Sequence, residues 1–519
     1  MKSFNGLFLF IFTTTYAIVT MALVVPRMKS LKQQSTLFAT TADRTSEKSI
    51  TTNDLLKTRV SQTGSNVSVF YKKEGGLVIT KGDGIHMIDE NGLNYLDCCN
   101  NVACVGHSHP AVVKAGCDEL SRIQTNGRFL HPTQQRYLTK LLATFPAELN
   151  TVFLVNSGSE ANDLALRIAQ QSSTAPSNHD VIVLDHAYHG HTGSLIGISP
   201  YKWYQAVDGR NRQPDTTHVM SCPDSFRGKF RMGSGPGMET SEEIGALYAE
   251  EINDIIKRTG GVGTFIAESV VGCGGQIILP DGYLKKCYEA VRSAGGVCIA
   301  DEVQTGFGRA GSNFWAFQEH GVVPDIVTLG KPMGNGYPVA AVVCRRELAD
   351  RFASTGIEYF NTYGGNSVAC AIAEAVLDTI IAEDLQKNSL LVGNYLLSKL
   401  KVLSQSHPWI GDVRGMGLFL GIEFVKLKDS PSTPVSTTHT TSVSKNTDDS
   451  KKETLLPYTS LCQYLVDYLM RERILVSSDG PDANVIKIKP PLVFSMSNAD
   501  TLVNGLERGL LAARDSGMF

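Results

Sequence analysis

The sequence predicts an α/β fold built on a large, mostly parallel sheet, and three features support this. From Val60 onward, short runs of β-branched residues alternate with helical patterns, the order expected when helices cover a parallel sheet. The 519 residues are 42% hydrophobic and 19% charged, enough to bury a large core and to divide into two lobes. The formal net charge of −3 gives no reason to expect nucleic acid as a partner.

The N-terminal segment, residues 1–58, is expected to lie outside the catalytic fold. Residues 6–25 form an apolar run that is long enough to span a bilayer. The Ser/Thr-rich stretch after it resembles an organelle transit peptide, with the basic residues Arg27, Lys29, Lys32 and Arg44 and no acidic residue before Asp43. We therefore expect a mitochondrial or plastid targeting sequence, or a membrane anchor if residues 6–25 are not cleaved.

Six apolar segments in the middle of the chain are predicted to be buried strands. Ligands of open α/β sheets bind beyond the carboxyl ends of the strands, so the polar residues that follow these segments are the first candidates for a site. The predicted strands are residues 151–156, 180–185, 264–269, 296–301, 325–330 and 338–344.

The predicted domain order places a large domain at residues 107–365 and a smaller α/β lobe at residues 59–106 and 366–519. Residues 426–453 within the smaller lobe are polar, rich in Ser and Thr and without periodicity. Such a segment cannot bury enough apolar area to order itself, so we predict a disordered surface insertion.

The first motif is a turn of small residues followed by a predicted helix at residues 156–169. Backbone N–H groups at a helix start, beside Gly158 and the hydroxyls of Ser157 and Ser159, form a site suited to phosphate. An ordinary capped helix start has the same residues, so this motif alone leaves both interpretations open.

The second motif, Asp-His-Ala-Tyr-His-Gly-His at residues 185–191, follows a predicted strand. The ring of Tyr188 could stack on a flat cofactor, and His189 could form a hydrogen bond with its substituents. His186 and His191 raise the alternative of a zinc site, but no cysteine or carboxylate joins them at metal-ligand spacing, so no metal is expected.

The third motif joins two strand ends, Asp301-Glu302-Val303-Gln304 and the later Lys331. A carboxylate at the end of an apolar strand is costly unless a cation pairs with it, and the protonated nitrogen of a pyridine cofactor would be such a cation. Val303 would pack on the ring and Gln304 would reach its phenolic oxygen. Burial and neighbouring charge can lower the pKa of a lysine such as Lys331 and allow Schiff-base chemistry.

Together these motifs resemble the class III aminotransferases, pyridoxal-phosphate (PLP) enzymes of fold type I. The resemblance rests on NSGSEAND, DHAYHGH, DEVQTGFGR, TLGKPMGNG and FNTYGGN, in this order, and runs from about Val60 to the C-terminus. It implies a homodimer with the active site at the subunit interface. It also implies that Lys331 binds the cofactor covalently, that Asp301 pairs with the ring nitrogen and that Gln304 contacts O3′.

The same resemblance assigns the remaining predicted contacts. Gly158 and Ser159 would hold the cofactor phosphate, and Tyr188 would stack on the ring. Thr362 of NTYGGN would reach the cofactor phosphate of the neighbouring subunit. Glu268 matches an acidic residue that the family places near the substrate.

One departure from the aminotransferases bears on the reaction. Family transaminases grip the substrate carboxylate with an arginine in a pattern like R-x-A-P-P, whereas this chain has Lys487 there, with Lys489 two residues later. An ammonium is a poor carboxylate fork but a good phosphate partner. Four segments resemble the ethanolamine-phosphate and 5-phosphohydroxylysine phospho-lyases more closely than the alanine–glyoxylate transaminases, which implies elimination of phosphate from a phosphorylated amine. These segments are residues 185–203, 223–231, 358–366 and 475–491. A transaminase of the alanine–glyoxylate or ω-amino acid type is the alternative, and a paralogue without catalysis is a third.

Overall fold

The computed structural model describes residues 51–203, 213–427 and 455–518. These residues fall into two units that divide between Val78 and Ile79. The first unit holds helix α2 (Thr52–Gln62) and the 3₁₀ helix η1 (Lys72–Glu74). The Thr51 side chain caps α2, so the boundary predicted at residue 58 falls inside a helix.

The predicted apolar span, residues 6–25, lies outside the described part of the chain. Among the residues that are described, no helix has both the length and the apolar composition needed to cross a membrane.

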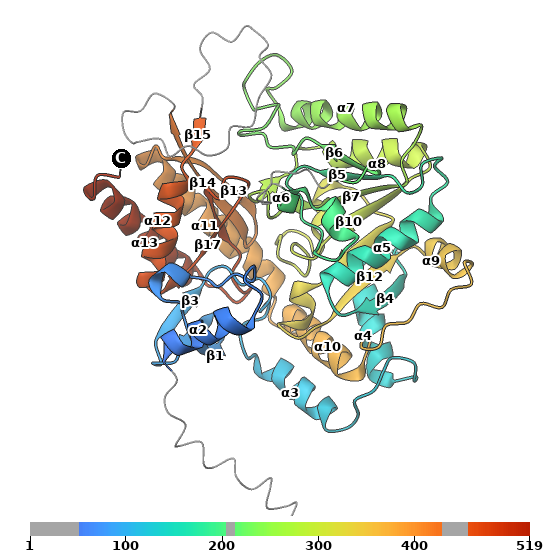
Figure 1. Cartoon of the computed structure of the whole chain (residues 1–519), viewed down its shortest axis with the longest axis horizontal. Helices are drawn as coiled ribbons and strands as arrows, with labels where there is room; N and C mark the ends of the chain where they lie inside the picture. Colours follow the sequence, from blue (N-terminus) through green and yellow to red (C-terminus); the bar gives the residue numbers. More distant parts are fainter. Residues whose placement is uncertain (1–50, 204–212, 428–454, 519) are drawn as a thin grey trace, which may run out of the picture. The chain divides into compact units, whose positions relative to one another are not determined.

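A seven-stranded sheet forms the centre of the second unit, with the strand order β4-β12-β11-β10-β7-β5-β6 (Figure 1). All strands are parallel to one another except β12, which is antiparallel to both neighbours. The predicted α/β fold with a mostly parallel sheet is therefore confirmed. All six predicted segments are strands, whereas β6 was not predicted. The strands are β4 (Thr151–Val155), β5 (Val181–Leu184), β6 (Thr217–Met220), β7 (Thr264–Glu268), β10 (Val297–Asp301), β11 (Ile326–Leu329) and β12 (Ala340–Cys344).

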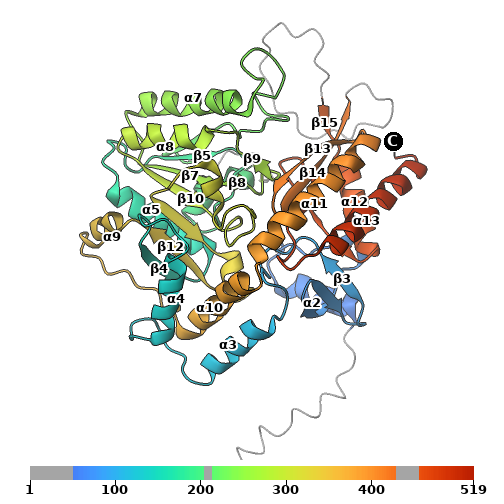
Figure 2. The ribbon, with the colours of Figure 1, turned by 180° about the vertical axis from the view of Figure 1, so that it is seen from behind.

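Alternate residues of the central strands pack against helices on opposite faces of the sheet. Ile299 of β10 belongs to the same buried cluster as the apolar side of α5 (Gly158–Ser172), whereas Cys298 lies against Tyr288 of α8 (Tyr283–Ser293). Because successive side chains of a strand point to opposite faces, both faces are covered, as a parallel sheet requires. Figures 1 and 2 show α7 (Ser241–Thr259) beside α8, and α9 (Arg346–Ala353) beside α5.

Two smaller sheets complete the second unit. The first has the order β1-β2-β3-β16, in which the early strand β3 pairs in parallel with the late strand β16. The other is antiparallel, with the order β13-β14-β18-β17 and β15 paired with β14. Their strands are β1 (Ile79–Asp83), β2 (His86–Asp89), β3 (Asn94–Asp97), β13 (Ile410–Met416), β14 (Phe419–Leu427), β15 (Leu455–Pro457), β16 (Ile474–Leu475), β17 (Ser477–Asp479) and β18 (Val485–Ile488); a short ribbon pairs β8 (Val270–Val271) with β9 (Ile277–Ile278).

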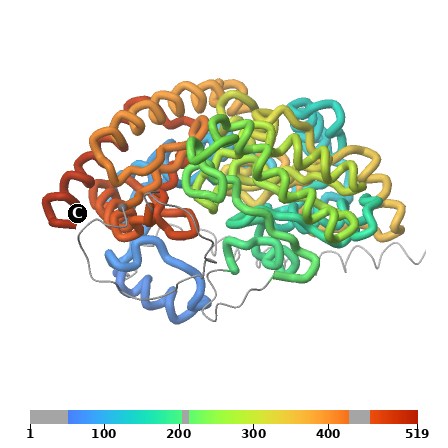
Figure 3. The backbone as a smooth tube through the Cα atoms, turned by 90° about the horizontal axis from the view of Figure 1, so that it is seen from above, coloured from blue at the N-terminus to red at the C-terminus, as the bar shows by residue number. Residues whose placement is uncertain are grey.

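Helices cover the antiparallel sheet as well, and Figure 3 shows α11, in orange, alongside the red C-terminal elements. The helices not yet given are α3 (Pro110–Leu120), α4 (Pro132–Leu142), α6 (Pro200–Trp203), α10 (Ser367–Ala382), α11 (Leu385–Ser406), α12 (Thr459–Arg471) and α13 (Met496–Asp515), with the 3₁₀ helices η2 (Leu195–Ile198), η3 (Ala316–His320) and η4 (Lys331–Gly334).

The predicted disordered insertion begins two residues too early. Lys426 and Leu427 belong to β14, because they continue its pairing with β15. The rest of the predicted segment, residues 428–453, lies outside the described residues. The second unit is a single compact body, so the domain boundaries predicted at residues 106 and 365 stay predictions.

Candidate active site

Three of the predicted residues meet at the carboxyl ends of neighbouring strands. Glu268 ends β7 and Asp301 ends β10, and the parallel register pairs the two directly. On the other side, Asp301 pairs with Thr328 of β11, and Lys331 follows that strand as the first residue of η4. The register therefore brings three separate sequence motifs to one edge of the sheet.

The Asp301 carboxylate is buried and held by three donors. Oδ2 accepts hydrogen bonds from Asn162 Nδ2 and His189 Nδ1, each at 2.8 Å, and Oδ1 accepts one from the Val303 N–H at 3.1 Å. His189, which the sequence predicts to contact the cofactor, also orients this carboxylate through its ring. Charge-assisted hydrogen bonds of this kind fix the position of the carboxylate.

The predicted phosphate site lies at the start of α5. Ser157 is the N-cap, and its Oγ accepts from the Glu160 N–H at 3.1 Å, while Ser159 Oγ accepts from the His191 N–H at 3.3 Å. Both hydroxyl hydrogens remain able to donate. Helix geometry also gives the N–H groups of Gly158 and Ser159 no partner within the helix. The helix start thus presents donors for an anion.

Val303 packs against this helix start and against the residue before Lys331. A Cβ atom on Gly158 would lie 2.7 Å from Val303 Cγ1, and one on Gly330 would lie 3.1 Å from it. Contacts this short leave no room for a side chain at position 158. Val303 therefore lies between the phosphate loop and the segment that carries the predicted catalytic lysine.

Gln304 and Glu268 form the next part of the site. Gln304 Nε2 donates to Glu268 Oε2 at 3.4 Å, and the other Glu268 oxygen accepts from the Tyr188 N–H at 3.3 Å. Burial raises the pKa of Glu268, and the nearby Asp301 carboxylate raises it further. The two residues thus lie at hydrogen-bonding distance within a buried polar network.

Tyr188 and Thr362 are placed differently from the other predicted residues. Tyr188 is half-buried, and its backbone contact with Glu268 ties it to the strand ends. Thr362 is exposed, in the loop before α10. Its neighbour Asn361 accepts a hydrogen bond from Asn156 Nδ2 at 2.8 Å, just before the helix start of α5. The loop is therefore fixed beside the phosphate site, while the Thr362 side chain faces outward.

The two lysines of β18 and its extension share one carboxylate. Lys487 Nζ lies 3.2 Å from Asp479 Oδ1, and Lys489 Nζ lies 3.7 Å from Asp479 Oδ2. Lys489 Nζ also donates to Gln304 Oε1 at 3.2 Å. Of the two lysines, Lys489 is the one that contacts a residue predicted to bind the cofactor.

Sequence reasoning missed three polar residues of this site. Asn162 lies one helical turn after Gly158, on the same helix face, so the spacing in NSGSEAND was an available signal. Lys489 was noted only as a neighbour of Lys487, and its burial could not be read from a strand of four residues. Asp479 could not be recognised as a site residue from the sequence, because its partners depend on the pairing of β17 with β18.

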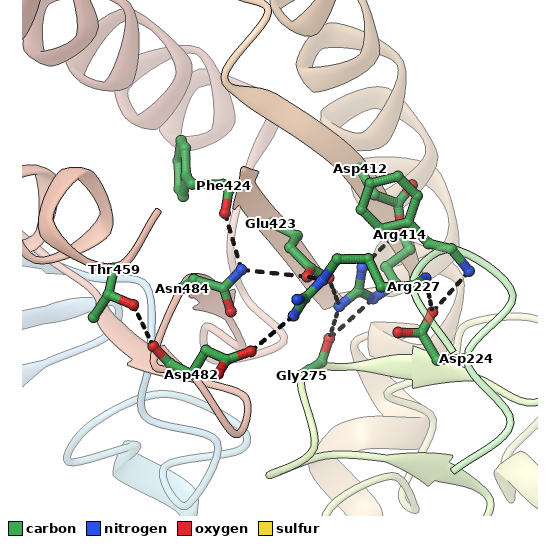
Figure 4. Close-up of polar contacts among 11 residues, drawn as sticks. Asp224, Arg227, Gly275, Asp412, Arg414, Glu423, Phe424, Thr459, Asp482 and Asn484 are labelled. Atoms are coloured by element: carbon green, nitrogen blue, oxygen red, sulfur yellow. Dashed lines mark hydrogen bonds and ion pairs between the residues drawn. The ribbon is translucent and has the colours of Figure 1, made fainter. Parts of the chain in front are cut away.

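A polar cluster beside the site joins loops of the large sheet to the antiparallel sheet (Figure 4). Arg227, after β6, contacts Glu423 of β14 and lies 3.1 Å from Asp482. Arg414 of β13 lies 2.7 Å from Glu423 and donates to the carbonyl of Gly275. The cluster lines a cavity of about 280 Å³ together with Asp185, His186, Cys222 and Asp224.

The side chains present fit pyridoxal phosphate. The buried carboxylate of Asp301 could pair with a protonated ring nitrogen. Gly158 leaves space that a Cβ atom could not share with Val303, and the start of α5 offers hydroxyl and N–H donors. Lys331 supplies an amine next to them. These residues would hold the ring nitrogen, the phosphate and the aldehyde of that cofactor.

Comparison with known proteins shows the family of the chain. The model of the family described as aminotransferase class-III matches residues 70–510. The chain belongs to the class III aminotransferases. An "Alanine--glyoxylate aminotransferase 2-like" protein of Drosophila melanogaster is 47% identical over 88% of this chain and 87% of its own length. "Ethanolamine-phosphate phospho-lyase homolog 1" of Caenorhabditis elegans is 39% identical over 88% of this chain and 93% of its own length.

Further relatives of this class III chain carry both kinds of name. Human "Alanine--glyoxylate aminotransferase 2, mitochondrial" is 40% identical over 70% of this chain and 72% of its own length. A solved phospholyase from Arthrobacter in complex with phosphoethanolamine is 35% identical, with a TM-score of 0.75, over 88% of this chain and 99% of its own. The fold is that of the fold type I PLP enzymes, as the resemblance implied.

Proposed function

We propose that this class III chain is a PLP-dependent phospho-lyase that eliminates phosphate from a phosphorylated amine. Ethanolamine phosphate and 5-phosphohydroxylysine are the proposed substrates, and the first would give acetaldehyde, ammonia and phosphate after uptake of one water. The observation that carries the proposal is Lys487, which stands where the family's transaminases have a carboxylate-binding arginine. The likeness to a phospholyase that binds phosphoethanolamine supports it.

The proposed chemistry assigns a role to each polar group of the site. When bound, pyridoxal phosphate supplies an electron sink for the carbon that carries the amine. Asp301, fixed by His189 and Asn162, keeps a negative charge opposite the ring nitrogen. Lys331 takes the proton from the amine-bearing carbon, and phosphate leaves from the next carbon.

The proposed partner is a second copy of the chain. Large apolar side chains are exposed beside Thr362, where Ile357 is 67% and Tyr363 is 71% exposed. Near them lies a cavity of about 290 Å³ lined by residues that include Arg128, Phe360 and Asn361. Exposed apolar patches mark interfaces, and a homodimer would bring Thr362 to the cofactor phosphate of the neighbouring subunit.

An organelle is the proposed location. The human relative named above is mitochondrial by its name, and the basic, Ser/Thr-rich segment after residue 25 has the composition of a transit peptide. A green fluorescent protein fusion to residues 1–58, compared with the same reporter alone, tests this. Uniform fluorescence throughout the cell would contradict it.

The alternative is a transaminase, favoured by the 47% identity to a relative named as an aminotransferase. Phosphate release from ethanolamine phosphate without a keto acid, compared with amine transfer to pyruvate or glyoxylate, separates the two reactions. We expect phosphate release, and a higher KM for the phosphorylated amine in Lys487→Ala with unchanged cofactor binding. Lys487→Arg alone should not create a good transaminase. Rapid transfer without phosphate release would favour the alternative.

A further inference from the structure

Asp479 brings two ammonium groups together with only one negative charge between them. Lys487 and Lys489 lie two residues apart on one strand face, and Asp479 of the neighbouring strand contacts both. Asp479 is 5% exposed and Lys489 is 2% exposed. Two ammonium groups and one carboxylate leave a positive charge in a place that water barely reaches.

Two uncharged groups also contact Lys489. Gln304 Oε1, an uncharged acceptor, lies at 3.2 Å, and the Phe419 ring centroid lies 4.3 Å from Nζ. Glu268 accepts a hydrogen bond from the amide nitrogen of Gln304 at 3.4 Å, and its charge raises the pKa of Lys489 less than the charge of Asp479 does. Neutral acceptors and an aromatic face stabilise an ammonium less than a carboxylate does.

Burial makes the two ammonium groups costly to keep charged. Burial lowers the pKa of Lys489 to about 8, although Asp479 opposes the shift. Burial also lowers the pKa of Lys487, but the contact with Asp479 outweighs it and the pKa ends above its usual value. A buried charge without a full partner is costly, and a bound anion would remove that cost.

We propose that Lys487 and Lys489 bind the substrate phosphate together, with Asp479 holding the two ammonium groups in place. This proposal rests on the proposed function and extends it from one lysine to a three-residue site. Lys489 is the specificity-determining residue, because it lies next to Gln304 at the cofactor end. A phosphate monoester offers three oxygens, so it can accept from two separate ammonium groups at once, whereas a planar carboxylate is better matched by one guanidinium fork.

The first test measures anion binding without turnover. Holoenzyme reduced with borohydride, in which the cofactor keeps its own phosphate site filled, is titrated with inorganic phosphate by calorimetry. We expect Lys489→Met to weaken phosphate binding by about tenfold or more, the loss of one charge-assisted contact. Lys426→Met is the matched control, because it removes a lysine from β14 of the same sheet, far along the chain from the site. Unchanged phosphate binding in Lys489→Met would overturn the proposal.

A second test separates this role from a structural one. Lys489→Met should raise KM for ethanolamine phosphate by about tenfold while changing kcat less. With the wild-type enzyme, inorganic phosphate and sulfate should compete with the substrate at concentrations where acetate does not, so the test holds even if the variant folds poorly. Equal inhibition by acetate would assign the site to carboxylates and overturn the proposal. If phosphate binds and depends on Lys489 but no phosphorylated amine is cleaved, the proposed function fails while the anion site stands.

Discussion

The Asp301 carboxylate is held in position by the chain itself, through His189, Asn162 and the Val303 N–H. Its charge is also close to Glu268, whose pKa is raised by burial and by Asp301. The network therefore fixes the Asp301 carboxylate at the point where the strand ends. At the scale of single residues, Asp301 should therefore be sensitive to substitution.

Asp301→Asn should leave some cofactor bound but remove most of the activity. A neutral amide cannot hold a ring nitrogen protonated, and losing a buried charge partner costs about 4 kcal/mol, or roughly a thousandfold in rate. The visible absorption spectrum reports bound cofactor, and kcat reports the chemistry. Asp378→Asn, the same change in an exposed ion pair, is the control. Activity within a few-fold of wild type would show that this carboxylate does not face the ring nitrogen.

Lys331→Ala should abolish turnover and leave the fold intact, because Lys331 is the only described lysine that directly follows a strand end beside Asp301. Borohydride reduction followed by peptide mapping should label the wild-type chain at Lys331 and leave the variant unlabelled. Lys489→Met, which removes another lysine near Gln304, should keep the label. A label on any other lysine would reject the assignment.

Three of the residues predicted from the sequence share one property, which is that they end a strand or follow it closely. Asp301, Glu268 and Lys331 could be placed because strand ends meet at one sheet edge in any parallel sheet. Asp479 could not, because its contact with Lys487 depends on the pairing of two short strands whose order in the sheet no local pattern encodes. β6 was also missed, because two of its four residues, Thr217 and His218, are polar and it has no apolar run.

At the scale of elements, the polar cluster of Figure 4 fixes the strands that carry the two lysines relative to the strand ends of the large sheet. Arg227 comes from the loop after β6, and Glu423 comes from β14, the neighbour of β18. Asp482, in the turn between β17 and β18, also contacts Arg227. The cluster thus positions Asp479 and Lys487 through the backbone of their own strands.

Glu423→Gln should lower the free energy of unfolding by about 3 kcal/mol, because it leaves the Arg227 and Arg414 guanidinium groups without their shared buried charge. Denaturant titration followed by circular dichroism measures this. The control is Glu472→Gln, which breaks an exposed pair with Arg508 and should cost under about 1 kcal/mol. Equal effects of the two substitutions would show that the cluster has no special role.

At the scale of the whole molecule, Thr362 lies apart from the other predicted site residues of its own chain. Thr362 is exposed in a loop that Asn361 fixes near the start of α5, and the large apolar residues Ile357 and Tyr363 around it are exposed as well. An active site completed by a second copy would cover this surface and use Thr362. The proposed dimer therefore has a consequence that can be measured by mixing two inactive chains.

Lys331→Ala and Thr362→Glu should each reduce activity strongly, the second because a carboxylate beside the cofactor phosphate repels it. If Thr362 serves the neighbouring subunit, a mixed dimer of the two variants has one site with both changes and one site with neither. Unfolding and refolding the two chains together should then restore up to half of the wild-type activity per mixed dimer, whereas each variant refolded alone stays inactive. If Thr362 acts in its own subunit, every site in the mixture carries one change and nothing is restored. Sedimentation of the wild-type chain as a monomer would exclude the proposed shared site.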